Sequence, residues 1–272
     1  MEPRTGTPGV DASGTRLALA LVGGIVIGTL GGLIGLGGAE FRLPLLIGLF
    51  GFAALPAVIL NKAMSLVVVA SALLFRTKAV PFDEVFAHWP IIVNLLAGSL
   101  LGAWLGADWA TRMKSQTLYR VLAVLLVLIA VVLLIGHDHT AGSALLTGAA
   151  QMAAGVVAGF GIGVVASLMG VAGGELLIPT LILLFGADIK LAGSPSLAVS
   201  LPTMIVGFTR YSRDGSFVAL RQNKWFVIVM AAGSLIGAWI GGRLLGIVPG
   251  GVLLPLLAAI LVISSVKVWK HK

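Results

Sequence analysis

The sequence predicts an all-α protein that crosses a membrane many times. Hydrophobic residues make up 58% of the 272 residues and only 10% are charged, whereas an average soluble chain carries about 25% charged residues. So few charges cannot cover the water-facing surface of a domain of this size, but a lipid-facing surface needs none. The 37 glycines follow no collagen-like period, so they indicate helices that pack closely through small residues or that break inside the bilayer.

The same composition excludes several other classes of protein. The absence of cysteine rules out disulfides, thiolate catalysis and cysteine metal sites. The net charge of +8 would suit nucleic acid, but the basic residues stand singly between apolar runs and form no patch with aromatic residues. The chain has no phosphate-binding Gly-x-x-x-x-Gly-Lys-Ser/Thr motif, and no histidine lies beside the polar residues of the apolar segments. We therefore expect no enzyme, no cofactor and no nucleic-acid partner.

Eight apolar stretches approach the roughly 20 residues that a transmembrane helix needs. They are residues 17–36, 53–75, 89–105, 118–135, 145–169, 191–208, 225–245 and 252–266. Residues 1–16 are polar and rich in glycine and proline, so we expect a disordered cytoplasmic tail there. The first apolar run follows Arg16, as the hydrophobic core of a signal peptide follows a basic residue. Because this run takes part in the repeat described below, we expect it to be retained in the protein.

Two further apolar pieces, at 40–52 and 175–187, are equal in length and shorter than any of these stretches. As helices they would be about 20 Å long, which is too short for an ordinary span. We expect each of them to be a short half-helix or part of a broken helix at membrane depth.

The chain matches itself when its second half is aligned with its first at a constant offset. The matched positions are 35–38 with 170–173, Glu40 with Glu175, Pro44 with Pro179, and 98–104 with 233–239. This duplication predicts two homologous transmembrane repeats, residues 17–135 and 145–272, joined by a linker at 136–144, with a basic end after the second repeat. Each repeat would hold about four transmembrane helices and one short helix, an organisation frequent among secondary transporters whose substrate site lies between the repeats.

The two repeats could be parallel or inverted. If the short pieces count as crossings, each half crosses five times and the halves are inverted. Twelve of the 18 Lys and Arg residues then lie on the side of the termini, and only Arg76, Lys78 and Arg243 lie on the other. Because cytoplasmic loops carry an excess of basic residues, this count favours the inverted arrangement, whereas the shortness of the two pieces argues against it. Both arrangements place both termini in the cytoplasm.

These motifs carry a family resemblance. A glycine turn with a proline six residues after its last glycine, an Ala-x-Ser-Leu helix and a Gly-x-x-x-Gly-Ala helix occur twice between about residues 17 and 266. The pattern resembles the sulfite exporter TauE/SafE family, which implies a multi-pass permease of the bacterial cytoplasmic membrane for sulfite or small organosulfonates. The chain departs from the commonest pattern at Ala39 and Ala172 and in its charged Glu40, Arg42 and Lys62. These departures leave the exact substrate open.

Glu40 and Glu175 stand in apolar sequence at equivalent repeat positions. A charge at bilayer depth costs at least ~2.5 kcal/mol on insertion scales, so neither side chain is expected to face lipid. One interpretation is a proton-coupling pair that exchanges protons during transport. The alternative is structural: each carboxylate locks a broken helix by accepting backbone N–H bonds, or pairs with Arg42 or Lys62.

Arg42 and Lys62 belong to the first repeat only, because their repeat mates are Leu177 and Leu197. A cation in one half of a symmetric framework would complement an anionic substrate, and the arginine fork suits two oxygens of a sulfonate. In the alternative, either side chain reaches the membrane interface or neutralises Glu40.

The remaining candidates for substrate binding are backbone and hydroxyl groups near the two short pieces. Successive N–H groups in a glycine turn at a helix start can hold an oxyanion, and hydroxyl and amide groups on the next helix could complete the pocket. Tight helix packing and hydrogen bonds to the serines' own helix are the structural alternatives. These candidates are Gly35, Gly37, Gly38, Gly170, Gly173, Gly174, Asn61, Ser65, Ser196 and Ser200.

The sequence thus favours a secondary transporter of a small oxyanion that works by alternating access between two repeats. An anion channel and a non-transporting membrane scaffold are the competing functions. His137, Asp138 and His139 in the linker are more typical of a polar turn than of a metal site. The expected partners are a small anion and the lipid bilayer, and the sequence leaves a homodimer open.

Overall fold

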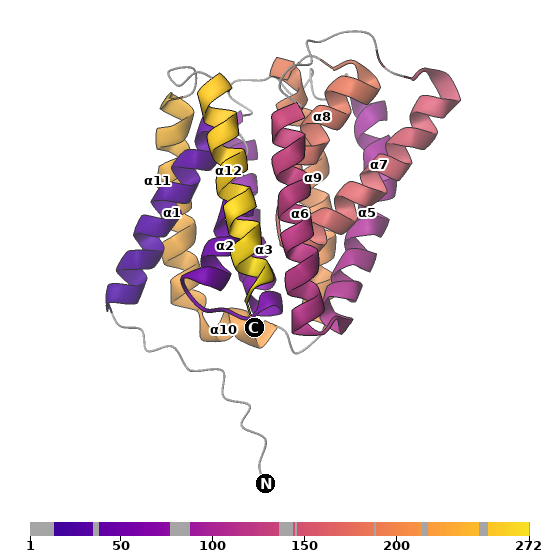
Figure 1. The fold of residues 1–272 in the computed structure, drawn as a ribbon. Coiled ribbons are helices and arrows are strands. Elements are labelled where there is room, and N and C mark those ends of the chain that lie inside the picture. Colours follow the sequence, from indigo (N-terminus) through magenta and orange to yellow (C-terminus); the bar gives the residue numbers. More distant parts are fainter. Residues whose placement is uncertain are drawn as a thin grey trace.

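The computed structural model describes residues 14–34, 38–76, 88–135, 144, 146–187, 189–213, 217–244 and 250–271. Within these residues every regular element is a helix (Figure 1), which confirms the predicted all-α class. The helices are α1 Gly14–Ile34, α2 Ala39–Gly48, α3 Ala54–Arg76, α5 Trp89–Arg112, α6 Ser115–Ile135, α7 Gly148–Met169, α8 Gly174–Phe185, α9 Ile189–Ser212, α10 Val218–Gln222, α11 Lys224–Leu244 and α12 Gly250–Trp269.

Six helices of the described chain are long and apolar enough to cross a bilayer: α1, α3, α5, α6, α7 and α11. We had predicted two more crossings, at α9 and α12. The 24 residues of α9 suffice in length, but they include Pro195, Pro202 and several hydroxyl side chains. Of these, Ser196, Ser200 and Thr203 are buried, so the polar groups of α9 face protein and not lipid. The apolar part of α12, Pro255–Trp269, is shorter than an ordinary span.

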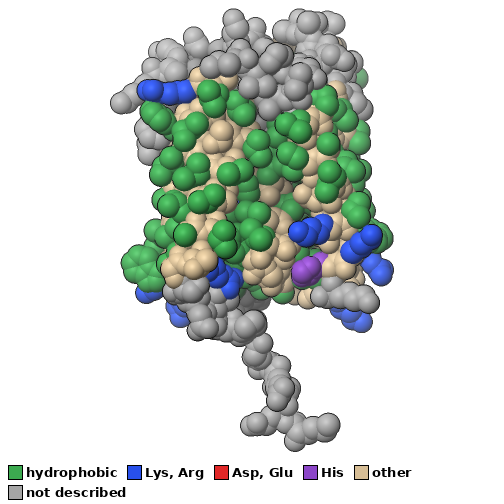
Figure 2. All heavy atoms as spheres, turned by 60° about the vertical axis from the view of Figure 1, so that its left-hand side comes forward, with side chains coloured by type: hydrophobic (Ala, Val, Ile, Leu, Met, Phe, Trp, Pro, Cys, Tyr) green, Lys and Arg blue, Asp and Glu red, His purple; other side chains and the backbone are tan. Residues whose placement is uncertain are grey.

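The outer surface is that of a membrane protein. Figure 2 shows hydrophobic side chains over the middle of one face and basic side chains toward its ends. Val157 and Ile263 are each 70% exposed and Leu101 is 64% exposed. Exposure of such large apolar side chains is unfavourable in water but not in lipid. Tryptophans are exposed at helix ends on both sides of this surface, where aromatic belts form at membrane interfaces. They are Trp89, Trp109, Trp225, Trp239 and Trp269. The chain is therefore a multi-pass membrane protein.

One end of the bundle, which we call the terminal end, carries both the start of α1 and the end of α12 (Figure 1). Arg16 of α1 donates to the Phe50 carbonyl beyond α2 at 3.2 Å, so α2 runs back to the end where α1 begins. Tyr119 near the start of α6 packs edge-on against His271 beyond α12. At the opposite end, Asn94 near the start of α5 donates to a carbonyl near the start of α7.

The helices run in both directions between the two ends of the bundle. The helices α1, α3, α6 and α11 begin at the terminal end, whereas α5, α9 and α12 finish there and α7 runs toward it (Figure 1). The short α2 runs toward the terminal end, and α8 runs toward the opposite end, where Gln151 of α7 donates to the Leu184 carbonyl at 2.8 Å.

Two glycine-lined pairs of helices, α1 with α11 and α5 with α7, make the most extensive contacts of the fold. A methyl group on Gly28 would collide with the Ser234 carbonyl oxygen, and one on Gly163 would collide with the Ser99 carbonyl oxygen. Both pairs therefore depend on backbone contact that only glycine permits. The Gly-x-x-x-Gly segments at 98–102 and 233–237 make the same kind of contact, as small residues do where helices pack closely.

Replacement of Gly163 by alanine is expected to destabilise the protein by ~1–3 kcal/mol or more, because the added methyl meets backbone that cannot move aside. Gly161→Ala on the same helix is the matched control, since its Cβ would lie in open space. The midpoint of thermal unfolding in detergent, together with the yield of monodisperse protein, measures the difference. Equal midpoints for the two variants would contradict close packing of α5 and α7.

Candidate functional site

The starts of α2 and α8 are built in the same way from equivalent residues. Gly38 precedes α2 with φ 70°, and Gly173 precedes α8 with φ 80°. Residues with a Cβ are strained at such positive φ values, which explains why both turns carry glycine. Both glycines are buried, and each is followed two residues later by a glutamate. The turn geometry thus aims the first turn of each short helix into protein.

Glu40 and Glu175 come together at these helix starts, although they belong to different halves of the chain. Their exposed fractions are 0% and 2%, and the two carboxyl groups lie close enough to hydrogen-bond to each other. None of the four carboxyl oxygens accepts a well-formed hydrogen bond from an N–H or O–H of the described residues. Two facing buried carboxylates without donors are costly. A proton held between them would supply a hydrogen bond and remove the repulsion.

The structural alternatives for these glutamates require hydrogen bonds or ion pairs at their carboxyl groups. Among the described residues, no backbone N–H group forms a well-formed hydrogen bond with these oxygens. The ion pairs found in the described chain join Asp108 to Arg112 and Arg210, and none of them involves Glu40 or Glu175.

Arg42 is fully buried and is held by three side chains from two other helices. Its Nε donates to Asn61 Oδ1 at 2.9 Å, its Nη2 to Ser65 Oγ at 3.0 Å, and its Nη1 to Ser234 Oγ at 3.2 Å. The guanidinium therefore joins α2 to α3 and α11 and does not reach the membrane interface. A guanidinium has five N–H donors, so two remain for an anion after these three bonds.

Asn61 connects the two glycine turns. Its amide Nδ2 donates to the carbonyl oxygens of Ala39, at 3.0 Å, and of Met169, at 3.1 Å. Its Oδ1 is already occupied by Arg42. Both ends of this side chain are thus used within the protein, so Asn61 positions Arg42 and the turns.

Lys62 reaches from α3 into the second half of the chain. Its Nζ donates to the Ala166 carbonyl at 3.3 Å and to Ser167 Oγ at 3.2 Å, and the side chain is 0% exposed. A methyl group on Gly207 of α9 would lie 2.8 Å from Nζ, so α9 covers the ammonium closely. The ion pairs of the described chain include no carboxylate with Lys62. The buried ammonium thus has no carboxylate partner among the described residues.

The second half contributes hydroxyl groups where the first half has charges. Ser196 and Ser200 of α9 are 3% and 1% exposed, and Ser200 Oγ lacks a hydrogen-bond partner among the described residues. The position equivalent to Arg42 is Leu177, also buried. We call the buried groups around Arg42, Lys62, Glu40 and Glu175 the buried centre. It is asymmetric, because both cations come from the first half of the chain.

The remaining predicted residues fall into two groups. Gly170, with φ 68°, ends α7 and packs its backbone on the Val58 carbonyl of α3, while Gly174 is the first residue of α8. These two positions therefore shape the turn. The others lie outside the described residues: Gly35, Gly37, His137, Asp138 and His139.

Several residues of this centre were missed from the sequence. Ser234 bonds Arg42, and Ser167 bonds Lys62 while its own carbonyl accepts from the Tyr211 hydroxyl at 3.0 Å. Ser234 and Ser99 both stand in the matched segments 233–239 and 98–104. A serine repeated in both halves beside a packing glycine was the available signal.

The chain was compared with known proteins in three ways. The family described as Sulfite exporter TauE/SafE matches residues 19–268, which is nearly the whole chain. No curated protein matches, and no solved structure matches.

Proposed function

The chain belongs to the sulfite exporter TauE/SafE family, and from this premise we propose that it is a secondary transporter of a small oxyanion such as sulfite or an organosulfonate. The observation that carries the proposal is the pair of fully buried cations, Arg42 and Lys62, neither of which forms a described ion pair with a carboxylate. A scaffold that only packs helices would not need such costly charges.

The free N–H donors of these two cations define the proposed anion site. Arg42 offers a planar pair of donors, and Lys62 keeps one of its three N–H groups after its two described bonds. A sulfite or sulfonate group presents three oxygens, which can be shared between a bidentate guanidinium and a point-like ammonium. The hydroxyl of Ser200 is a further buried group without a hydrogen-bond partner among the described residues.

We further propose that the two halves are inverted repeats that alternate access to this site. The opposite directions of equivalent helices support this arrangement. So do the equivalent contacts of Gly28 with Ser234 and Gly163 with Ser99, which pair each half's first helix with a helix of the other half. Because Arg42, Lys62 and Glu40 are all 0% exposed, transport requires one end of the bundle to open.

An ion pair at the terminal end is suited to control such opening. Asp108 of α5 pairs with Arg210 of α9, and Arg112 binds the same carboxylate at 2.9 Å. The pair joins helices from the two halves. Opening of this end would separate α5 from α9 and break it.

For the glutamate pair we propose proton coupling. A shared proton makes the centre less negative and therefore favours the anion, and the bound anion favours the proton by linkage. A permease that binds both together moves them in the same direction across the membrane.

We place the terminal end in the cytoplasm of a bacterium, with the protein in the cytoplasmic membrane. Arg16, Arg120 and Lys270 are among the basic residues at this end, and basic residues are retained on the cytoplasmic side.

The natural absence of cysteine allows a direct test of this orientation. Lys114→Cys lies between α5 and α6 at the terminal end, and Thr147→Cys lies before α7 at the opposite end; both positions are exposed. A membrane-impermeant maleimide is expected to label Thr147→Cys in intact spheroplasts and Lys114→Cys only in inside-out vesicles. The reverse pattern would place the terminal end outside the cell.

The function itself is tested by flux in proteoliposomes. A panel of sulfite, organosulfonates, sulfate and chloride is offered to the purified protein with and without an imposed proton gradient. A coupled carrier accumulates one of the sulfur oxyanions against its gradient only when the proton gradient is present. Passive flux that never exceeds equilibrium would instead indicate an anion channel, and no flux of any anion would indicate a scaffold.

A further inference from the structure

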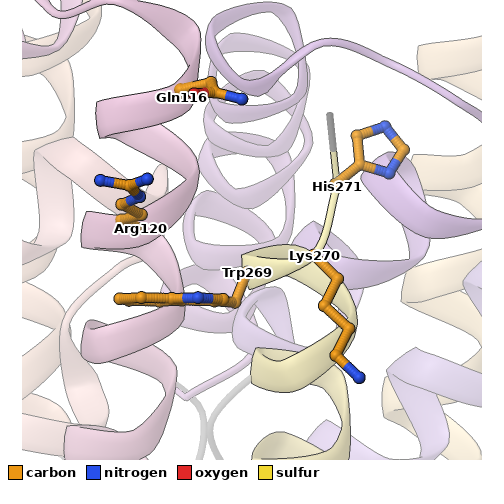
Figure 3. A pocket seen from close by; sticks show the side chains of 5 residues that line it. All are labelled: Gln116, Arg120, Trp269, Lys270 and His271. Carbon is orange, nitrogen blue, oxygen red and sulfur yellow. The ribbon is translucent and has the colours of Figure 1, made fainter.

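A basic pocket lies at the terminal end, away from the buried centre. It has a volume of about 360 Å³ and lies between the start of α6 and the end of α12 (Figure 3). Its lining residues are Gln116, Arg120, Trp269, Lys270 and His271. Three of these five side chains can carry positive charge, and none is acidic.

The charges of this pocket have no acidic neighbours on the helices that form it. Neither α6 nor α12 contains an aspartate or glutamate. The Arg120 guanidinium lies 5.8 Å from the centre of the Trp269 ring, and the His271 ring is held edge-on against Tyr119. Gln116 is the second residue of α6, where free backbone N–H groups add partial positive charge. Within α6 and α12, the pocket therefore has basic neighbours and no acidic one.

The position of the pocket favours a ligand that comes from the membrane. Trp269 is 52% exposed, as expected of a side chain in an interfacial belt. From this point toward the middle of the bilayer, the same two helices expose Val124, Ile263 and Val266. Figure 2 shows a histidine and basic side chains at the edge of the hydrophobic surface. A ligand with a phosphate in the pocket could lay an acyl chain along this apolar surface.

We propose that this pocket binds the phosphate of an anionic phospholipid from the leaflet at the terminal end. Arg120 and Lys270 donate to the phosphate oxygens, and Trp269 packs beside the glycerol backbone. A basic pocket between transmembrane helices is the recognised chemistry for such head groups. Since α6 comes from the first half of the chain and α12 from the second, the bound lipid would also hold the two halves together at this edge.

Native mass spectrometry of the full chain in nonionic detergent tests the proposal. The protein is titrated with phosphatidylglycerol, with phosphatidylcholine of the same acyl chains, and with inorganic phosphate. The first phosphatidylglycerol is expected to bind at least several-fold more tightly than phosphatidylcholine. Arg120→Gln/Lys270→Gln removes two positive charges near the membrane surface, so it should weaken the binding of that lipid by roughly tenfold or more.

Two control variants make the result specific. Arg243→Gln removes an arginine that also lies over a tryptophan, Trp239 at 4.1 Å, but at the opposite end of the bundle; it should keep the preference. Arg120→Lys/Lys270→Arg keeps both charges and should keep it as well, which guards against a folding defect in the neutral variant.

Three outcomes would overturn the proposal. The first is an unchanged lipid preference in the neutral double variant. The second is an equal loss in Arg243→Gln, which would indicate a general effect of net charge. The third is displacement of phosphatidylglycerol by millimolar inorganic phosphate, which would assign the pocket to a soluble anion.

Discussion

The Glu40→Gln/Glu175→Gln double variant is expected to exchange anion for anion with a flat pH profile and to lose accumulation against a gradient. Glutamine has nearly the same shape as a protonated glutamate and cannot release a proton. The two wild-type carboxyls face each other without other hydrogen-bond donors among the described residues, so loss of their proton leaves repulsive charge beside an anion site. Wild-type transport should therefore rise as the pH falls, and the double variant should transport at the rate of the protonated form.

Counterflow and proton-driven uptake in the same proteoliposomes measure the two parts of this prediction. Each single variant keeps one carboxyl and is expected to retain part of the pH dependence. A double variant that still accumulates substrate under a proton gradient would assign these glutamates a structural role. Equal thermal stability of the variants and the wild type excludes a folding defect as the cause.

The elements that the sequence predicted well are those with a signal along the chain. Long apolar runs predicted the six candidate spans of the described chain, although they also predicted crossings at α9 and α12, and the glycine turns predicted the starts of α2 and α8. The repeat alignment placed Glu40 and Glu175 at equivalent positions, and in the structure these residues face each other.

The contacts between distant helices could not be predicted in this way. Helices such as α1 and α7 are apolar on all sides, so hydrophobic periodicity does not say which face meets which neighbour. The bond from Arg42 to Ser234 joins residues far apart in the sequence and depends on the packing of α1 and α11. An alignment of repeats relates equivalent residues but gives no information on residues in contact.

The hydrogen bonds of Arg42 and Lys62 show which of the two cations is better replaced in a test of anion binding. Arg42 binds Asn61, Ser65 and Ser234, and hydrogen bonds to a charged group contribute ~1.5–3 kcal/mol each. Its removal would therefore disturb the packing of α2, α3 and α11 as well as any anion. Lys62 makes two bonds, both to the α7 region, and its removal should leave the fold intact.

Lys62→Met is expected to reduce anion transport at least tenfold while the protein still folds and inserts. Methionine keeps most of the length of lysine and its apolar stem, but it removes the ammonium that faces Ser167 and Gly207. A lost charge-assisted contact of ~1.5–3 kcal/mol corresponds to roughly a 10- to 150-fold weaker interaction. Initial rates over a range of substrate concentrations in proteoliposomes, with unfolding midpoints alongside, measure the effect.

The Lys62→Arg variant tests whether transport needs only the positive charge at this position or also the shape of the lysine side chain. A methyl on Gly207 would already lie only 2.8 Å from Nζ, so the broader guanidinium has little room beneath α9. Lys62→Arg should consequently restore only part of the transport although it restores the charge. Lys114→Met, which removes an exposed lysine between α5 and α6, is the matched control and should transport like the wild type. If Lys62→Met also transports like the wild type, the buried ammonium serves to join α3 to α7, and the anion site must be sought around Arg42 alone.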